Sequence, residues 1–392
     1  MRHLQANKFL RLALVIATMA MRVAWAQDVQ KGSLSLTTQD RLDDAGWWPT
    51  KGDAARSKFA GDTTCKECHG DVAALQEATP MYHAAVRAAQ SEILEARQQL
   101  NYQDTFYQYS LTHAHPGVMY SVSDGKSFAV GDVEWAFGAG KIGQTYILER
   151  NGAYTESHLS YYSALSGLDI TIGQPVDPPP EMDRALGQTL SHDTAQHCFS
   201  CHTTAAVTSN TFNPEKAIPG VTCEACHGPG AKHVAAMSVH HSEWDAKNTI
   251  MNPEHLSPSD SVDFCGACHR TWSDVAMQMP GNIGVASVRF QPYRLEKSRC
   301  WGKNGDARIT CIACHDPHRP LVREPKSYDA ECLACHVSKG QSQQKAATAP
   351  ACKVSVSNCV SCHMPKYEVP QSHTTFTDHY IRIVRAGAGF PS

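Results

Sequence analysis

Seven copies of the pattern Cys-x-x-Cys-His limit what this 392-residue chain can fold into more than any other feature. They use fourteen of the sixteen cysteines, so the disulfide framework that a cysteine-rich exported protein ordinarily contains is excluded for most of them. The copies are Cys65-Cys68-His69, Cys198-Cys201-His202, Cys223-Cys226-His227, Cys265-Cys268-His269, Cys311-Cys314-His315, Cys332-Cys335-His336 and Cys359-Cys362-His363.

This spacing predicts covalent attachment of c-type haem. Two cysteines one helical turn apart can each form a thioether with one haem vinyl group, and the histidine that follows then lies under the iron. Structural zinc would need four ligands from paired knuckles, and seven knuckles cannot pair off. A redox dithiol explains neither the number of copies nor the histidine that ends each one. We therefore expect seven covalently bound haem c groups, with the seven motif histidines as proximal iron ligands.

Residues 1–26 have the pattern of a secretory signal peptide. Basic residues precede an apolar run from Leu12 to Met21, and Ala24-Trp25-Ala26 matches a small-residue cleavage site. A membrane anchor is the alternative, but the run is shorter than the about 20 residues that span a bilayer. Thioether attachment of haem takes place outside the cytoplasm. The signal and the motifs therefore predict the same location, which is the periplasm or the extracellular face of the cell surface.

The charge of the mature chain narrows the choice of partners. Without the four basic residues of the leader, 31 basic residues stand against 38 acidic ones, a formal charge of −7, which argues against nucleic acid as a partner. No later segment has the length and apolar content of a transmembrane helix. We expect other redox proteins as partners, either cytochromes or a quinol-linked membrane complex, and the sequence leaves an oligomer open.

The stretch CIACHDPH at 311–318 holds a second histidine three residues after the motif histidine. Two imidazoles bound in line to one iron place their Cα atoms about 13 Å apart, if the metal–nitrogen bond is about 2 Å as in zinc sites. Three residues span at most about 11 Å. His318 is therefore predicted to reach a neighbouring iron. A surface histidine after the turn at Asp316-Pro317 is the alternative.

Thirteen histidines lie outside the motifs and the leader, enough to give every iron a second axial ligand. His233 follows His227 by six residues, so reach does not exclude the same iron, and a solvated histidine is the alternative. His83 follows Thr79-Pro80, a helix-start signal that predicts a helix to about Leu100 with His83 off its apolar ridge. The further candidates, for each of which a surface or hydrogen-bonded role is the alternative, are His113, His115, His158, His192, His197, His240, His241, His255, His373 and His379.

The first two motifs are separated by 133 residues, and this gap has a pattern of its own. Asp124-Gly125 and Asn151-Gly152 each stand between β-prone runs and predict two-residue hairpin turns in an antiparallel unit from about 105 to 172. Residues 178–180, three prolines, predict a stiff linker. The unit is expected to be a spacer or docking surface, with substrate binding as the alternative.

These patterns predict a mainly α fold with much irregular structure, built around the seven haems, and a small antiparallel β unit inserted between haem 1 and haem 2. About 200 residues cannot surround six macrocycles with a conventional apolar core. The expected units after the signal peptide are an N-terminal segment with haem 1 and a helix at 27–104, a haem-free β-rich insert with the proline linker at 105–180, and a six-haem cytochrome domain at 181–392.

Cys300 and Cys352 are the two cysteines outside the motifs. In an oxidising compartment, a pair left over in one domain favours a disulfide between them.

The mature chain resembles multihaem c-type cytochromes of the superfamily that includes pentahaem nitrite reductase, octahaem hydroxylamine oxidoreductase and the tetrahaem cytochrome that accepts electrons from the latter. The resemblance lies in GVTCEACHGPGAKH, RITCIACHDPH, CVSCHMPK with the later HTTFTDHYIR, and the first motif followed by YHAAV. It implies bis-histidine haems stacked in parallel and perpendicular pairs. It also implies that His83, His233, His318 and one of His373 or His379 are distal ligands.

Two departures from that superfamily affect the functional prediction. Pentahaem nitrite reductases carry a lysine in place of the histidine at the catalytic haem, whereas all seven motifs here end in histidine. The number of haem motifs also differs, since this chain has seven, whereas the nitrite reductases have five and the hydroxylamine oxidoreductases have eight. The catalytic role therefore does not transfer, while electron transfer does. We expect a non-catalytic cytochrome that moves single electrons along mostly bis-histidine haems. The alternative is an oxidoreductase acting on a small nitrogen or sulfur compound at one five-coordinate haem.

Overall fold

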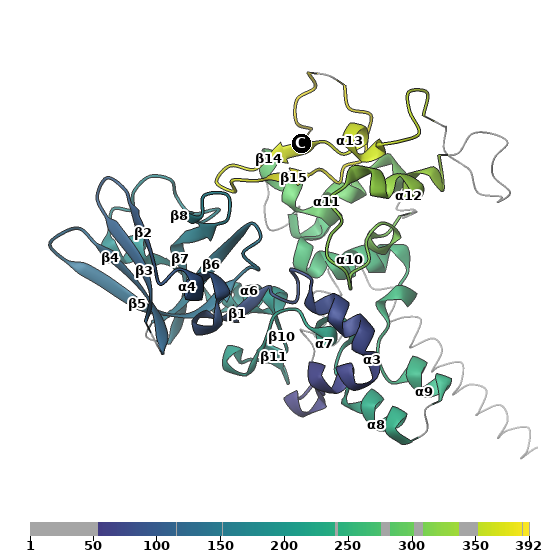
Figure 1. Cartoon of the computed structure of the whole chain (residues 1–392), viewed down its shortest axis with the longest axis horizontal. Helices are drawn as coiled ribbons and strands as arrows, with labels where there is room; N and C mark the ends of the chain where they lie inside the picture. Colours follow the sequence, from purple (N-terminus) through teal and green to yellow (C-terminus); the bar gives the residue numbers. More distant parts are fainter. Residues whose placement is uncertain are drawn as a thin grey trace, which may run out of the picture.

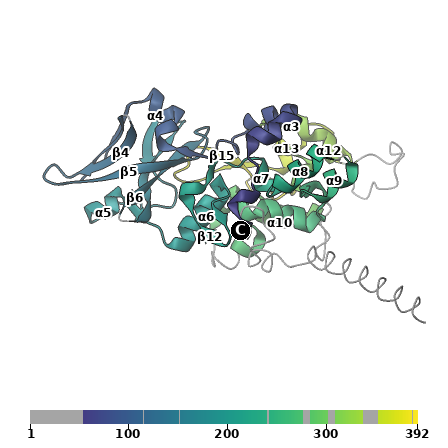
Figure 2. The ribbon, with the colours of Figure 1, turned by 90° about the horizontal axis from the view of Figure 1, so that it is seen from below.

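The computed structural model describes residues 54–391, apart from 115, 151, 240–241, 276–282, 302–308, 337–351 and 386. The predicted leader at 1–26 and the candidate ligands His115, His240 and His241 lie outside the described residues. The described chain has two parts, a large β-sheet and a column of short helices beside it (Figure 1). In the view from below, the same two parts lie side by side (Figure 2).

The sheet has nine antiparallel strands, paired in the order β2-β3-β4-β5-β6-β7-β8, with β1 pairing to β5 and β9 to β7. It bends so strongly that the two ends of the path, β2 and β8, come into contact. The strands are β1 (Ala85–Arg87), β2 (Gln99–Gln103), β3 (Gln108–Ala114), β4 (Gly117–Ser123), β5 (Phe128–Phe137), β6 (Gly143–Arg150), β7 (Ala153–Tyr162), β8 (Gly167–Ile170) and β9 (Gly187–Thr189).

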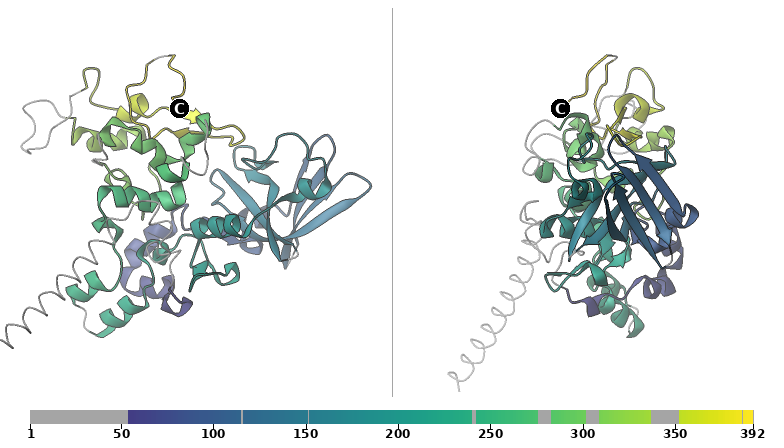
Figure 3. Two further views of the ribbon diagram at one scale, coloured as in Figure 1. Left: turned by 180° about the vertical axis from the view of Figure 1, so that it is seen from behind. Right: turned by 90° about the vertical axis from the view of Figure 1, so that its left-hand side faces the viewer.

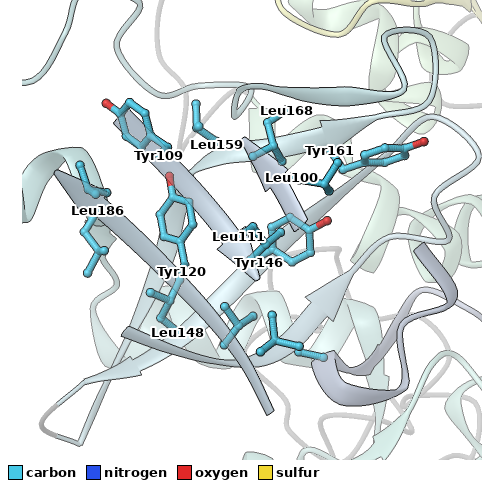
Figure 4. Packing of buried hydrophobic residues seen from close by; sticks show 14 of the residues in the cluster. Leu100, Tyr109, Leu111, Tyr120, Tyr146, Leu148, Leu159, Tyr161, Leu168 and Leu186 are labelled. Atoms are coloured by element: carbon cyan, nitrogen blue, oxygen red, sulfur yellow. The ribbon is translucent and has the colours of Figure 1, made fainter. Parts of the chain in front are cut away.

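The curved sheet encloses the main hydrophobic core of the described chain (Figure 4). Alternate residues of β3 and β4 point inward, so that Tyr109, Leu111 and Tyr120 are at most 2% exposed. The short helices α4 (Glu92–Ala96) and α5 (Met182–Leu186) add Leu94 and Leu186 to this core. Buried aromatic side chains of this size dominate the stability of a core.

The two predicted hairpin turns are both present, but only one has the predicted length. Arg150 pairs directly with Ala153, which leaves a two-residue turn between β6 and β7. Between β4 and β5 the pairing of Ser123 with Phe128 leaves four residues. There Asp124 Oδ1 accepts hydrogen bonds from the backbone N–H groups of Lys126 and Ser127, at 2.8 and 2.7 Å. The side chain of Asp124 thus stabilises a longer turn than Asp-Gly alone predicts.

The prediction of a mainly α chain with a small β unit is wrong, because the nine-stranded sheet is the largest element and extends from Ala85 to Thr189. The helix expected from Pro80 to Leu100 is replaced by a turn, β1, a 3-10 turn at Ala88–Gln90, α4 and the start of β2. The stretch is rich in helix formers, but Ala85 and Val86 pair with β5. Tertiary pairing and burial here outweigh helix propensity.

The proline run at 178–180 does not end the sheet region, because the chain returns through α5 and pairs β9 with Thr155–Ser157 of β7. The chain leaves the sheet only at α6 (His192–His202). Ser191 caps this helix by accepting a hydrogen bond from Thr194 N.

The motif-bearing elements form the column (Figure 3). Its helices are α3 (Asp62–Glu77), α6, α7 (Cys223–His227), α8 (Ala231–Val239), α9 (Glu243–Asn248), α10 (Pro258–His269), α11 (Gln291–Glu296), α12 (Asp329–Leu333) and α13 (Cys359–His363). Short strands β10 (Thr203–Thr204) to β13 (Ile218–Pro219) follow α6, and β14 (Lys366–Glu368) pairs with β15 (Thr375–Thr377). Within the described residues, the apolar cluster of this part is built on Val262, Leu295 and Trp301. Protein side chains alone thus form only a small core here.

In the part of the chain that the structure describes, no helix combines the length and the apolar character needed to cross a bilayer.

Candidate haem-binding sites

Each motif lies on a helical turn, which brings its two cysteines and its histidine to one side of the backbone. Motif 1 lies within α3, motifs 2 and 4 end α6 and α10, and motifs 3 and 7 form α7 and α13. Motif 5 begins on a 3-10 turn at Cys311–Ala313, and motif 6 begins on α12. None of the fourteen motif cysteines is in a disulfide, so all are available for thioether attachment.

A second imidazole lies opposite each of the motif histidines His69, His227 and His315. The ring centroids of His69 and His233 are 6.4 Å apart. Those of His227 and His318 are 6.0 Å apart. Those of His315 and His379 are 6.2 Å apart. Two imidazoles bound in line to one metal, with metal–nitrogen bonds of about 2 Å, place their ring centroids about 6 Å apart. The three pairs therefore fit an iron between the rings.

Hydrogen bonds at Nδ1 orient several of these rings. Nδ1 of His227 lies 2.9 Å from the carbonyl oxygen of Met251, and Nδ1 of His379 lies 3.0 Å from that of Thr377. Nδ1 of His233 lies 3.1 Å from Thr249 Oγ1. A ring that donates through Nδ1 presents an unprotonated Nε2, which is the arrangement found around metal-bound histidine.

The proximal histidines of motifs 2 and 7 have the same support. Nδ1 of His202 lies 3.0 Å from the carbonyl oxygen of Ala84, and Nδ1 of His363 lies 2.8 Å from that of Arg382. The donor set therefore fits haem iron: sulfur atoms for the porphyrin, and imidazoles held in one tautomer for the metal.

The motifs lie close to one another in a continuous series. Cys65 of motif 1 hydrogen-bonds to Cys223 of motif 3. The remaining neighbours in this series are Cys226 with Cys265, Cys265 with Cys311, Cys314 with Cys332, and Cys332 with Cys359. Motif 2 lies beside motif 4, because Cys201 Sγ contacts the carbonyl oxygen of Ala267 at 3.5 Å. The column thus holds motifs 1, 3, 4, 5, 6 and 7 in order, with motif 2 as a branch at motif 4.

Comparisons with known proteins agree with this reading of the motifs. The family model for cytochrome c554 and c-prime matches residues 178–228, which contain motifs 2 and 3. The chain is 24% identical over 189 residues to the multihaem cytochrome MtrA of Shewanella baltica, covering 44% of this chain and 53% of that protein. The chain is a multihaem cytochrome.

A second relative of this cytochrome is the dissimilatory sulfite reductase MccA of Wolinella succinogenes, 25% identical over 182 residues, which cover 37% of this chain and 22% of that protein. The chain thus spans about half or less of the length of these two relatives. No solved structure matches the cytochrome.

The structure distinguishes between the two C-terminal candidates of the cytochrome. His379 faces His315, whereas Nε2 of His373 lies 2.8 Å from Asp169 Oδ2 and its ring packs on Tyr162 of the sheet. His83 is also engaged through Nε2, which lies 2.8 Å from the carbonyl oxygen of Glu77. Iron ligation by His83 or His373 would have to break these contacts, so both stay predictions.

The remaining described candidates lie elsewhere in the cytochrome. His113 and His158 are buried in strands β3 and β7, where His158 stacks on Tyr109 at 6.0 Å between ring centroids. His192 and His197 lie on α6, and His192 packs edge-on against Phe212. His255 ends an exposed 3-10 turn. Their roles as ligands stay predictions.

The expected disulfide is not formed, because Cys300 and Cys352 are both free thiols. Cys300 is half-buried among the cysteines of motifs 5 and 6, since its charge interacts with those of Cys314 and Cys332. Cys352 is exposed. The disulfide was predicted because these two cysteines were the ones left over, and that argument takes no account of the distance between them.

Sequence reasoning missed the groups that hold the histidines. The carbonyl oxygens of Ala84, Met251 and Arg382 carry no sequence signal, since every residue has one. The ion pair between Arg294 and Asp378, which lies beside His379, has one sequence signal, the position of Asp378 directly before His379.

Proposed function

We propose that this chain is an exported heptahaem cytochrome that carries single electrons between redox partners outside the cytoplasm. The observation that carries the proposal is the set of three imidazole pairs, His69 with His233, His227 with His318 and His315 with His379, at ring separations of 6.0 to 6.4 Å. When bound, each haem supplies a one-electron couple at iron.

The chain's own side chains fit electron transfer better than catalysis. A histidine on each face of the iron closes both axial positions, so that no substrate can bind there, and two imidazole ligands favour a lower potential than a histidine–methionine pair. Burial lowers the pKa of His227, and the nearby imidazoles of His318 and His69 lower it further. The lowered pKa keeps the His227 ring neutral, which is the form that binds a metal.

The continuous series of motif contacts supports a path along the column. His69, His233, His227 and His318 lie close enough for their charges to interact, so pairs 1 and 3 are neighbours. His379 likewise interacts with His315 and His269, which links motifs 5 and 4. Histidines that lie this close between motifs 1 and 3 and between motifs 4 and 5 would hold successive redox groups at short range.

The expected redox partners and location are consistent with electron transfer. The likeness to a multihaem cytochrome supports other redox proteins, either cytochromes or a quinol-linked membrane complex, as donor and acceptor. The leader-like residues 1–26 and the need for thioether attachment support export to the periplasm or cell surface.

The likeness to a sulfite reductase favours one second candidate, reduction of a small sulfur or nitrogen compound at one five-coordinate iron. A single set of measurements separates the two. Intact mass should show seven haems, and EPR of the ferric protein should show low-spin iron only. A high-spin signal near one-seventh of the iron in the wild type would favour the enzyme, and fewer than seven haems would reject the heptahaem assignment.

A further inference from the structure

The six-haem part of the cytochrome contains an ion pair that is fully shielded from solvent. Arg294 on α11 and Asp378, just after β15, are both 0% exposed. Nε of Arg294 donates to Asp378 Oδ1 at 2.8 Å, and Nη2 donates to Oδ2 at 2.9 Å. The guanidinium also donates through Nη1 to the carbonyl oxygen of Pro391 at 3.0 Å and lies over the rings of Phe390 and Tyr380.

Such a pair is a poor way to gain stability. Removing two charges from water costs several kcal/mol per ion, and apolar residues of similar volume often stabilise a protein equally well or better. A bidentate pair does, however, fix geometry, because the planar fork of arginine matches a carboxylate in one orientation. The function of the pair should therefore be sought in what it holds in place.

Asp378 begins a short segment, residues 378–382, that touches two motif histidines. His379 directly follows Asp378 and faces His315 of motif 5 at 6.2 Å. Four residues after Asp378, the carbonyl oxygen of Arg382 lies 2.8 Å from Nδ1 of His363 in motif 7. The segment therefore supplies the ring opposite one motif histidine and the hydrogen-bond acceptor of another.

Further hydrogen bonds also fix the position of this segment. Asp378 N donates to the carbonyl oxygen of Pro365, and Asp378 Oδ2 accepts from Arg382 Nη1 at 2.7 Å. Ser298, 3% exposed on the turn after α11, donates to the carbonyl oxygen of His379 at 3.0 Å and accepts from Ile381 N at 2.8 Å. The segment is thus attached to the end of α11 at two points, Arg294 and Ser298.

We propose that Arg294 and Asp378 are positioning residues that set two axial histidines together, His379 opposite His315 and His363 through the carbonyl of Arg382. This inference rests on the proposed function, because it takes His379 as an iron ligand. Its consequence is that the positions of the ligand rings at motifs 5 and 7 depend on the same peptide segment. Loosening the segment changes both haems and leaves haems 1 and 3 unchanged.

Two variants of the full-length, haem-loaded protein test the proposal. Arg294→Met together with Asp378→Asn replaces both charges with neutral side chains of similar size, so neither member of the pair is left as an unpaired charge. Arg382, 14% exposed, loses the carboxylate of Asp378 but keeps the carbonyl oxygen of Tyr380 and the hydroxyl of Tyr367 as acceptors. Ser298→Ala removes the second attachment and keeps the ion pair. Its matched control is Ser287→Ala, because Ser287 is also 3% exposed and donates to a backbone carbonyl, that of Gly284, away from the segment.

Three measurements are needed. Intact mass gives the haem count, EPR of the ferric protein gives the g-values, and a potentiometric titration monitored through the optical spectrum of the protein gives the midpoint potentials. In both test variants we expect altered low-spin g-values for one haem, because the angle between the His315 and His379 rings, 46° in this structure, is no longer fixed. We also expect a higher midpoint potential for haem 7, since a weaker hydrogen bond at Nδ1 makes His363 a weaker donor. Ser287→Ala should match the wild type.

A separate variant keeps this test distinct from that of the proposed function. His379→Ala should convert one haem of seven to high-spin iron. If the number of high-spin haems is the same in His379→Ala as in the wild type, His379 is not an iron ligand, and the ligation on which the proposal rests is wrong. If His379→Ala behaves as expected but both test variants carry seven haems with unchanged g-values and potentials, the ion pair only supports the fold and the positioning role is rejected.

Discussion

The imidazole of His318 lies parallel to that of His227, with ring centroids 6.0 Å apart and planes inclined by 11°, although His318 is only three residues from His315 in the sequence. This is the position that the reach argument predicts, and ligation of the iron at His227 by His318 stays a prediction. The segment 311–318 joins two sites, with its motif histidine at one and its last histidine at the other.

His318→Ala should open one axial position, at the iron bound by His227. We expect one haem of seven to become high-spin in the ferric EPR spectrum. The double variant His318→Ala/His379→Ala should contain two such haems, because the two histidines face different motif histidines. A double variant with only one high-spin haem would contradict this pairing. Ser287→Ala, at a serine that donates to the carbonyl oxygen of Gly284, serves as the control.

The sheet should influence haem 2 through Phe137. The Phe137 ring lies face to face with the imidazole of His202, at 4.8 Å and 3°, and packs among Trp135 and Phe199. Phe137→Ala should cost about 3–5 kcal/mol of folding free energy in urea unfolding, as for other buried phenylalanines. It should also change the low-spin g-values of one haem, because the His202 ring loses the surface that fixes its rotation.

Phe212→Ala provides the comparison for Phe137→Ala. Phe212 packs on Phe199 and Tyr154 in the same cluster, and its ring lies edge-on to His192. The Phe212→Ala variant should lower the free energy of unfolding without changing the EPR spectrum. If both variants change the spectrum equally, general loosening of the cluster, and not the Phe137–His202 contact, controls haem 2.

Local chemistry made the motifs, and the position of His318 beside the histidine of another motif, predictable from sequence. The motif is read by spacing alone, and His318 followed from bond lengths and chain reach. The extent of the sheet did not follow, because β1 pairs with β5 across about 50 residues and no local pattern reports such a contact. The choice of His379 over His373 also depended on long-range contacts, with Asp169 of the sheet in one case and His315 in the other.

The two cysteines outside the motifs should react at different rates. The pKa of the exposed Cys352 thiol is lowered by hydrogen bonds from the backbone N–H groups of Ser355 and Val354, so more of it is thiolate at neutral pH. Burial raises the pKa of the Cys300 thiol. Because the thiolate is the nucleophile, iodoacetamide should label Cys352 first and Cys300 slowly, as followed by mass spectrometry. Cys352→Ser should remove the fast phase, and the absence of any labelling would indicate a disulfide after all.

The stability of the cytochrome should depend on pH through Glu296, at the end of α11. Burial, and next the charge of Asp263, raise the pKa of Glu296 from 4.5 to about 7. The folded state therefore holds this proton more tightly than the unfolded state. The stability that the neutral carboxyl contributes is complete below pH 4.5 and is lost as the pH rises through about 7.

Glu296→Gln removes this dependence because its amide stays neutral. The variant should match the wild type near pH 4 and become more stable relative to it between about pH 4.5 and 7, by up to about 3 kcal/mol above that range, given 1.36 kcal/mol per pKa unit. Thermal unfolding of both proteins from pH 4 to 8 measures the difference, with the exposed Glu254→Gln as control. A constant difference between variant and wild type across this range would show that the Glu296 carboxyl titrates alike in the folded and unfolded chains.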